Sequence, residues 1–228
     1  MSSSEDLIRL WPAAGVRVRS GDLELRWIDD DLLLELAELA ARGVHAPDAM
    51  PFEHPWTRGT PDEVARSVLA YQWKMRAEVS PAKFVLELGV LIDGEPVGVQ
   101  GLVAHEWPVL RRVTTGSWLG LAHQGRGIGR RMRVLALHLA FAGLAAREAA
   151  TGAFADNPAS NGVTRRLGYE ENGSVLVSRE GVAALHHNFR MTREQWGRLR
   201  EQHATILGSP VAMDGVDALR GFLGAPPA

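Results

Sequence analysis

The stretch His123-Gln124-Gly125-Arg126-Gly127-Ile128-Gly129 decides the fold of this chain, and Arg130-Arg131-Met132-Arg133 follow it. An apolar and β-branched run over residues 113–121 leads into it, and an alanine- and leucine-rich run over residues 134–146 leads out. The pattern predicts a strand, a glycine-rich turn and a helix. Three glycines at alternate positions let the backbone approach a ligand closely. Because helix N-terminal amides and the helix dipole both attract anions, the turn predicts an anion-binding site.

Four arginines surround the start of the expected helix, at positions 126, 130, 131 and 133. Exposed cations there are unfavourable by roughly 0.3–1 kcal/mol each, and a partner carrying phosphates would reverse that cost. The same arginines would also fit a solvated helix face. Two familiar phosphate loops are excluded, because the chain lacks G-x-x-x-x-G-K-[ST] here and its glycine spacing departs from G-x-G-x-x-G at Arg130.

The composition is that of an ordinary globular protein, with 46% apolar and 23% charged residues among 228. This length holds one sizeable domain, with or without an appendage. The formal net charge of −2 argues against a general nucleic-acid binder. The absence of cysteine excludes disulfides, thiolate nucleophiles and cysteine metal sites.

Targeting and metal signals are also missing from the sequence. No apolar run approaches the roughly 18 residues of a membrane helix. Residues 1–6 lack the basic start and apolar core of a secretory signal. We therefore expect a cytoplasmic protein without a membrane partner. The histidine, aspartate and glutamate residues show no metal-ligand spacing, so no metal is expected.

The apolar periodicity predicts a mixed sheet with helices on its faces. Two expected helices carry clear start signals, because Asp29-Asp30-Asp31 supplies an N-cap and Thr60-Pro61-Asp62-Glu63 supplies a capping box with a proline. In chain order, the expected elements are a hairpin over residues 16–27, helices over about 32–42 and 61–78, a hairpin over 83–104, a strand over 113–121, the helix after the glycine loop, a strand over 149–155, a short helix over 157–167, strands over 169–177 and 182–191, and a helix over 193–204 that Thr192 caps.

Residues 43–59 form a different kind of segment, interrupted by three prolines that prevent regular structure. Phe52 and Trp56 make it too apolar for a simple solvated loop. A long, aromatic, proline-stiffened loop is typical of a binding wall. We therefore predict that Phe52, Glu53, His54 and Trp56 bind the substrate.

Two motifs together carry a resemblance to a known family. Gln124-Gly125-Arg126-Gly127-Ile128-Gly129 resembles the Q/R-x-x-G-x-G/A motif of the GCN5-related N-acetyltransferase (GNAT) superfamily. Asn157-x-x-Ser160-x-x-x-x-x-Arg166-Leu167-Gly168-Tyr169 resembles the N-x-x-S-x-x-x-x-x-K-L-G-F segment common in its RimJ/RimL-like branch. The order of the expected elements is also similar to the GNAT fold, so the resemblance covers roughly residues 16–191.

The resemblance implies an α+β fold, in which a twisted and mostly antiparallel mixed sheet splays open between two parallel strands, with helices on both faces. It implies acetyl-CoA or another acyl-CoA as co-substrate, with its pyrophosphate on the glycine loop. The residues expected to bind it are Leu119 and Leu121 through their backbone, Gln124, Gly125, Arg126, Gly127, Ile128, Gly129 and Arg130 in the loop, and Asn157 and Ser160 beyond the second strand. Helix capping alone would also explain Asn157.

The implied reaction is direct attack of a primary amine on an acyl thioester, which needs no covalent enzyme intermediate. A tyrosine often protonates the leaving thiolate in the superfamily, but the matching position here is Thr164. Ser160, with Asn157 beside it, or a water is the substitute expected. His105 and Glu106 are the candidate general bases, because they end a strand and histidine and glutamate side chains commonly serve as bases. Either residue could instead be a solvated loop residue.

Three functions remain open from the sequence. The favoured one is an acyl-CoA-dependent N-acyltransferase that moves an acetyl or longer group, such as succinyl, to a small-molecule or peptide amine. The missing tyrosine suggests a non-catalytic acyl-CoA-binding module as the alternative. An aminoacyl-tRNA-dependent enzyme would need a broad basic surface, which the net charge of −2 disfavours.

The expected domain organisation is a flexible start over residues 1–15, a single GNAT-like domain over residues 16–206, and a tail over residues 207–228. The tail is apolar enough to pack on the domain or on a neighbouring subunit, which leaves a homodimer open.

Overall fold

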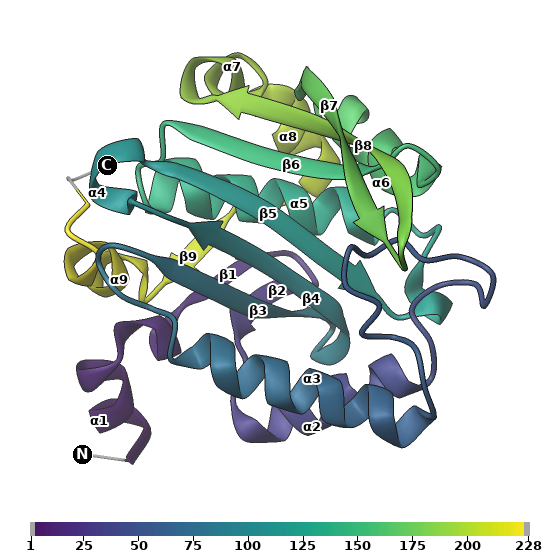
Figure 1. Ribbon diagram of the computed structural model, residues 1–228. Coiled ribbons are helices and arrows are strands. Elements are labelled where there is room, and N and C mark those ends of the chain that lie inside the picture. The colour runs from purple at the N-terminus through teal and green to yellow at the C-terminus, as the bar shows by residue number, and fades with distance from the viewer. Residues whose placement is uncertain (1–2, 226–228) are drawn as a thin grey trace.

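The computed structural model describes residues 3–225, and within them the strands form a single nine-stranded sheet (Figure 1). The strands are β1 (Arg17–Ser20), β2 (Leu23–Trp27), β3 (Phe84–Ile92), β4 (Glu95–Ala104), β5 (Arg112–Leu119), β6 (Glu148–Phe154), β7 (Glu170–Arg179), β8 (Val182–Thr192) and β9 (Ala212–Asp214). Their spatial order is β7-β8-β6-β5-β4-β3-β2-β1-β9. β5 and β6 run parallel, and the other neighbouring pairs are antiparallel.

Helices cover both faces of the sheet, which confirms the expected fold class (Figure 1). One face, which we call the α3 face, carries α2 (Asp30–Ala41) and α3 (Pro61–Arg76), and the opposite α5 face carries α5 (Ile128–His138). The other helices are α1 (Ser3–Leu10), α4 (Trp107–Leu110), α6 (Pro158–Arg166), α7 (Arg193–Arg198), α8 (Arg200–Leu207) and α9 (Val216–Phe222), with 3-10 turns at Pro12–Gly15 and Leu121–His123 and a π turn at Leu139–Gly143.

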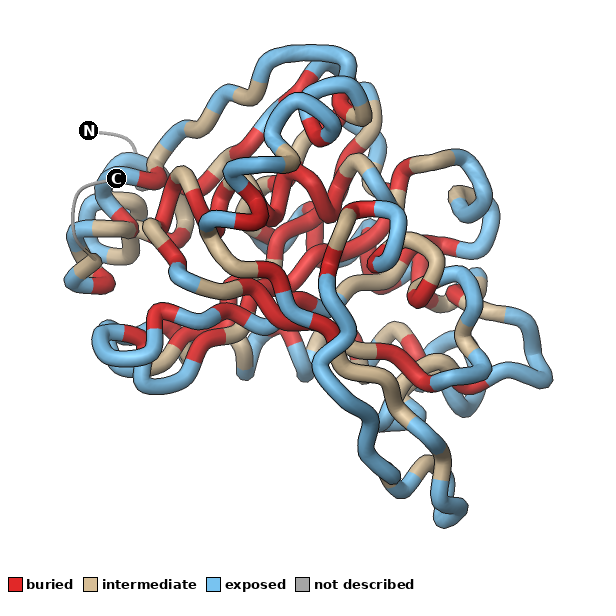
Figure 2. Tube along the Cα trace, turned by 90° about the horizontal axis from the view of Figure 1, so that it is seen from above, coloured by how far each residue is buried: buried red, intermediate tan, exposed pale blue. Residues whose placement is uncertain are grey.

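Two hydrophobic cores hold these layers together, one on each face. The larger lies on the α5 face and includes Met132 and Leu135 of α5. The smaller lies under α2 and α3 and includes Leu36 of α2 and Val68 of α3. Buried residues fill the middle of the molecule and exposed ones its edges (Figure 2). The alternation of side chains along the strands produces this division, because each strand contributes to both faces.

The predicted helix starts are confirmed in atomic detail. The Asp29 side chain accepts a hydrogen bond from the Leu32 amide at 2.9 Å. Thr60 and Glu63 form both halves of a capping box. Thr192 caps α7, and Gln195 completes a capping box there because glutamine can replace glutamate in that role.

The first and last described segments of the chain lie side by side at one edge of the sheet. Residues 3–10, in the stretch expected to be flexible, form α1. In the expected tail, β9 pairs with β1, and Phe222 of α9 lies 6.0 Å from Trp11, between ring centroids. Residues 1–2 and 226–228 of these two segments lie outside the described residues. Among the helices of residues 3–225, none is both long and apolar enough to span a membrane.

Candidate active site

The central feature of the site is a gap between β5 and β6. Their backbones pair over only three positions, which end at Thr114 and Ala150. At the next position, side-chain hydroxyls form the hydrogen bonds between the two strands. The Thr115 hydroxyl donates to the Ala150 carbonyl at 3.3 Å, and the Thr151 hydroxyl donates to the Thr115 carbonyl at 3.1 Å. Beyond this level each strand continues without the other, as the expected splay requires.

Arg133 of α5 reaches into the base of this gap from the α5 face. It is 5% exposed. Its Nη1 donates to the Thr151 hydroxyl at 3.0 Å, and its Nη2 donates to the Ser117 hydroxyl at 3.2 Å. Within residues 3–225, Arg133 makes no ion pair. The site therefore holds a buried cation that only neutral groups solvate, which is an expensive arrangement for a protein interior.

Three buried polar atoms beside the gap lack a hydrogen-bond partner within the described residues. They are the Arg133 Nε, the Gln100 Oε1 and the Tyr169 hydroxyl. Gln100 stands opposite Ser117 in the sheet. Burial raises the pKa of Tyr169, while the nearby Arg133 charge lowers it. Because buried polar groups are nearly always satisfied, these atoms indicate a place for a polar ligand or water.

The strand backbone offers further polar groups to the same gap. The Thr115 carbonyl faces β6, whereas the Gly116 carbonyl faces β4, where it accepts from Gln100 at 2.9 Å. Backbone direction alternates along a strand, so the N–H and C=O of Ser117 face the gap. The same rule turns the N–H and C=O of Gly152 on β6 into it, because the Ala150 carbonyl faces β5.

The glycine loop lies at the open end of the gap, between β5 and α5. Gly125 and Gly127 have φ angles of 73° and 80°, in the left-handed region that favours glycine. The amides of Arg130 and Arg131 both donate to the Gly127 carbonyl. The amides that precede them stand at the free end of the helix, where they can bind an anion.

Gln124 has a structural role that the sequence did not reveal. Its Nε2 donates to the Leu119 carbonyl at 2.9 Å and to the Val44 carbonyl at 2.7 Å. The Leu121 amide donates to the Gly43 carbonyl at 2.9 Å. The predicted backbone contacts at Leu119 and Leu121 are thus engaged with the protein itself, and Gln124 ties the end of β5 to the segment after α2.

The four arginines of the loop divide into three environments. Arg126 and Arg130 are exposed at the loop. Arg131 forms an ion pair with Asp22, and its hydrogen bond lowers the pKa of that carboxyl group. Arg133 turns inward to the gap. Of the four, Arg126 and Arg130 are therefore placed to meet an anion at the loop.

The second motif forms the cap and first turns of α6, beyond the end of β6. The Asn157 Oδ1 accepts from the Ser160 amide at 3.0 Å, so Asn157 caps the helix. Ser160 is half-buried. Thr164 is 2% exposed, and its hydroxyl donates to the Ser160 carbonyl at 3.0 Å. The position where the superfamily places a tyrosine thus carries a hydroxyl bonded within its own helix.

The structure does not bring His105 and Glu106 to the gap. They occupy an exposed turn between β4 and α4, where Glu106 has a φ angle of 47°. Thr115 pairs with Leu102, three residues before His105 along β4. The two residues therefore lie at the closed end of the parallel pair, away from the place where the strands separate.

Residues 43–59, which we call the aromatic loop, fold over the α3 face beside β5. The ring of Trp56 lies 5.0 Å from that of Phe52 and 5.8 Å from that of Trp118 on β5, between centroids. Glu53 and His54 are exposed on the same loop. The two aromatic side chains thus pack inward, and the two charged or polar ones face solvent.

The turn between β7 and β8 holds this loop in place. Arg58 donates twice to the Glu180 carboxylate, at 2.8 and 3.1 Å. Arg179 donates to the Met50 carbonyl at 3.2 Å and to both oxygens of Asp156 at 2.8 and 2.7 Å. These contacts connect the loop, the β7–β8 turn and the end of β6.

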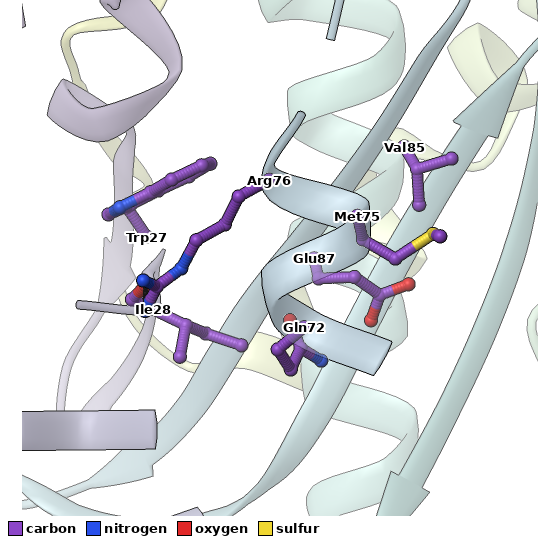
Figure 3. Close-up of a pocket in the computed structure, with 7 residues that line it drawn as sticks. All are labelled: Trp27, Ile28, Gln72, Met75, Arg76, Val85 and Glu87. Atoms are coloured by element: carbon purple, nitrogen blue, oxygen red, sulfur yellow. Dashed lines mark hydrogen bonds between the residues drawn. The ribbon is translucent and has the colours of Figure 1, made fainter. Parts of the chain in front are cut away.

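Glu87 on β3 is a candidate that sequence reasoning missed. It lies between the sheet and α3, in a small pocket that Gln72, Met75 and Arg76 also line (Figure 3). The Tyr71 hydroxyl donates to Glu87 Oε1 at 3.2 Å. Burial raises the pKa of Glu87 to about 7, although hydrogen bonds from Tyr71 and Gln72 oppose the rise. A carboxyl group with such a pKa can exchange protons near neutrality.

The chain is similar to known acetyltransferases in sequence and in fold. The family model of the acetyltransferase (GNAT) domain matches residues 22–170. RimJ from Mycobacterium smegmatis, solved in complex with CoA-disulfide, has a TM-score of 0.66 at 18% identity, covering 86% of this chain and 93% of that one. A GCN5-related N-acetyltransferase from Brucella melitensis has a TM-score of 0.67 at 16% identity, covering 90% and 94%.

A third similar structure is that of an enzyme that acts on a ribosomal protein. It is the acetyl transferase from Salmonella typhimurium that modifies the N-terminal serine of 50S ribosomal subunit protein L7/L12, with a TM-score of 0.60 at 19% identity, covering 76% of this chain and 96% of that one. At these identities, the structural likenesses establish a shared fold.

Proposed function

The chain belongs to the acetyltransferase (GNAT) domain family, and on that premise we propose that it transfers an acetyl group from acetyl-CoA, held across the gap between β5 and β6, to a primary amine. The main support for this proposal is that the parallel backbone pairing of β5 and β6 stops at Thr114 and Ala150, although both strands continue. It leaves backbone groups of Ser117 and Gly152 facing a gap that an amide-bearing chain can enter.

The residues around the gap fit an acyl-CoA as substrate. The free amides of the glycine loop and the exposed Arg126 and Arg130 suit a pyrophosphate. The orphaned polar atoms of Arg133, Gln100 and Tyr169 suit a polar chain at the base of the gap. We propose that the loop residues Gly125–Arg130 hold the pyrophosphate, while Gln124 positions the loop.

The chemistry requires a base for the acceptor ammonium, donors for the oxyanion and a proton for the thiolate. Thr164 is not available as the proton donor, because the residue is buried and its hydroxyl is bonded to the Ser160 carbonyl within α6. Ser160 therefore remains the proposed donor on the β6 side of the gap, with Asn157 as the residue that fixes its backbone. His105 and Glu106 lie at the closed end of the parallel pair, which makes them weaker candidates for the base.

The acceptor is proposed to approach from the α3 face, where Phe52, Trp56 and Trp118 form an aromatic wall. The Salmonella typhimurium protein modifies an N-terminal serine, so the N-terminal amine of a peptide is the first acceptor class to test. A small-molecule amine is the second class.

The proposal is tested by acetyl-CoA binding and by thiol release. Calorimetry should detect acetyl-CoA binding to the wild-type protein, and Arg126→Glu with Arg130→Glu should weaken it at least tenfold. Arg198→Glu, an exposed substitution on α7, is the matched control and should leave the affinity unchanged. Thiol release with Ser-Ala-Ala, spermidine and succinyl-CoA or acetyl-CoA then defines the acceptor and donor. Absence of acyl-CoA binding would contradict the proposal.

A further inference from the structure

Four residues on four neighbouring strands form one straight row across the sheet. Glu87 on β3 pairs with Gly101 on β4, and Gly101 pairs with Gly116 on β5. The parallel ladder ends with Thr114 opposite Ala150, so two residues further on Gly116 lies level with Gly152 of β6. The row therefore crosses the gap at the level where β5 and β6 separate.

The row lies on the α3 face, which is the face proposed for the acceptor. Trp118, two residues after Gly116, packs against Trp56 of the aromatic loop. Glu87 accepts its hydrogen bond from Tyr71 of α3. Because side chains two residues apart share a face, the three glycines leave a stretch of this face without side chains.

The surroundings of each glycine define the two ends of this bare stretch. A Cβ atom at Gly101 would lie 2.6 Å from Glu87 Oε1, so the carboxylate extends over Gly101. A Cβ atom at Gly152 would lie 2.3 Å from His186 Cε1, so an imidazole covers that end. A Cβ atom at Gly116 would meet nothing within 4 Å, and Gly116 is exposed. The space over Gly116 is thus open between a carboxylate and an imidazole.

The distances suit proton transfer from a group above Gly116. Neighbouring strands lie about 4.8 Å apart, so a carboxylate over Gly101 is roughly one strand spacing from that position. This is within reach of a hydrogen bond, directly or through one water. On the other side of Gly116, the His186 imidazole covers Gly152 at the β6 end of the row. Its Nδ1 lies 3.2 Å from Asn188 Oδ1, and this contact fixes the orientation of the ring.

The charges around Glu87 leave its carboxylate free to accept a proton. Tyr71 and Gln72 of α3 are its hydrogen-bonding neighbours. Arg76 lines the same pocket, but its guanidinium donates to Asp30 at 2.6 Å and to the Ile28 carbonyl at 2.9 Å. Within residues 3–225, Glu87 makes no ion pair with Arg76 or Lys83. Its proton affinity is therefore not suppressed by a bound cation.

Resting on the proposed function, we propose that Gly101, Gly116 and Gly152 form the floor of a channel for the acceptor ammonium group, and that Glu87 is the general base at its β3 end. Because the floor carries no side chains, the channel suits a primary amine on an unbranched stem. An N-terminal amine next to a small side chain fits the same description. The alternative occupant of the channel is an ordered water chain that serves a base elsewhere. In that case Glu87→Gln would keep the wild-type rate.

The Glu87 carboxylate takes one proton from the acceptor ammonium and later releases it to solvent. The amine nitrogen then forms a bond to the thioester carbonyl carbon, and the carbon–sulfur bond breaks with its electron pair on sulfur. The second nitrogen-bound proton ends on the thiolate, so the products are an amide, a free thiol and one proton.

The first test uses Glu87→Gln and Gly116→Ala, with the acceptor that the wild-type protein uses from Ser-Ala-Ala and spermidine. Glu87→Gln should lower kcat at least 100-fold and abolish its fall below about pH 7, while the Kd for acetyl-CoA stays within twofold. Gly116→Ala should raise the KM for the amine at least tenfold, because its methyl group occupies the channel floor. Gly197→Ala, an exposed position on α7 with nothing within 4 Å of the added Cβ, is the matched control.

The second test needs no acceptor, because the chain contains no cysteine. Gly116→Cys introduces a single thiol on the channel floor, and Gly197→Cys introduces one far from it. Saturating acetyl-CoA should slow the reaction of N-ethylmaleimide at position 116 at least fivefold and leave position 197 unchanged. Equal rates at position 116 with and without acetyl-CoA would overturn the channel.

The outcomes separate this inference from the function on which it rests. If the wild-type protein fails to bind acetyl-CoA, the proposed function falls and the channel falls with it. If binding and turnover are intact but Glu87→Gln keeps the wild-type rate and pH profile, Glu87 is not the base and the glycine row holds at most water. Thermal unfolding of each variant confirms that a lost rate does not reflect lost folding.

Discussion

Thr151 on β6 and Thr115 on β5 mark the level at which the two parallel strands part. The Thr151 hydroxyl donates to the Thr115 carbonyl at 3.1 Å, and the Thr115 hydroxyl donates to the Ala150 carbonyl at 3.3 Å. Side-chain hydroxyls thus replace the backbone ladder for one further position. The closed end of the gap is thereby fixed by hydrogen bonds that do not draw the strands together beyond it.

Replacing Thr151 with valine should destabilise the fold. The substitution keeps the shape of the side chain but removes the bond to the Thr115 carbonyl and the acceptor for Arg133 Nη1. Leaving these buried groups unsatisfied should cost about 1–3 kcal/mol in the free energy of unfolding, measured by urea denaturation. Thr205→Val is the control, because Thr205 is an exposed residue bonded only within α8. Equal effects at the two sites would contradict this role for Thr151.

Arg133→Met should separate the charge of Arg133 from its packing. Methionine retains much of the volume, so removal of a buried cation that lacks an acidic partner should change the free energy of unfolding by less than about 1 kcal/mol. Acetyl-CoA binding should nevertheless weaken, because Ser117 and Thr151 lose the donor that orients their hydroxyls. Arg133→Ala is the contrasting variant and should cost about 2–4 kcal/mol by leaving a cavity. Unchanged affinity in Arg133→Met would assign Arg133 a purely structural role.

The glycine loop and the capping box at Thr60 were predictable because each is a local pattern, in which neighbours along the chain determine the geometry. The row from Glu87 to Gly152 was not, because it exists only through the register of four strands. Glu87 stands in the apolar run Phe84–Ile92, where a single carboxyl group carries no sequence signal of its own. Gly101 and Gly116 resemble ordinary strand glycines until the pairing places them side by side.

The arginines at positions 126, 130, 131 and 133 show the same limit on a smaller scale. Their spacing indicated a basic helix start, but not which side chain would turn inward. That depends on the gap, since Arg133 finds its acceptors on β5 and β6. Asp22, the partner of Arg131, lies more than a hundred residues away in the sequence.

Glu180→Gln should loosen the aromatic loop without unfolding the protein. Arg58 and Glu180 are 45% and 37% exposed, and pairs of this kind contribute only about 0.2–1 kcal/mol to stability. Their loss should instead increase amide hydrogen exchange over residues 43–59, where the β7–β8 turn now holds the loop. High salt should produce a similar increase in the wild-type protein, because exposed charges are screened.

Glu171→Gln is the matched control for this exchange experiment. Glu171 also pairs with an arginine, Arg165, and is exposed, but it lies at the other end of β7. Exchange over residues 43–59 should be unchanged in this variant. Similar exchange in Glu180→Gln and the wild-type protein would show that aromatic packing alone holds the loop.

Stability should depend on pH through two groups that act in opposite directions, His138 and Glu87. Burial lowers the pKa of His138 to about 4, with smaller contributions from His203 and Arg200. The unfolded state, with an ordinary histidine pKa near 6.5, then binds the proton more readily than the folded state. The contribution of neutral His138 is therefore complete above about pH 6.5 and is lost as the pH falls toward 4.

The opposite sign holds for Glu87, whose pKa burial raises from 4.5 to about 7. Its protonated form is favoured in the folded state, so its contribution is complete below about pH 4.5 and is lost as the pH rises to 7. Urea denaturation should therefore show that His138→Leu reduces the loss of stability between pH 6.5 and 5. Glu87→Gln should reduce the loss between pH 5 and 7. Each change should be about 1 kcal/mol. Parallel pH profiles for both variants and the wild type would contradict these assignments.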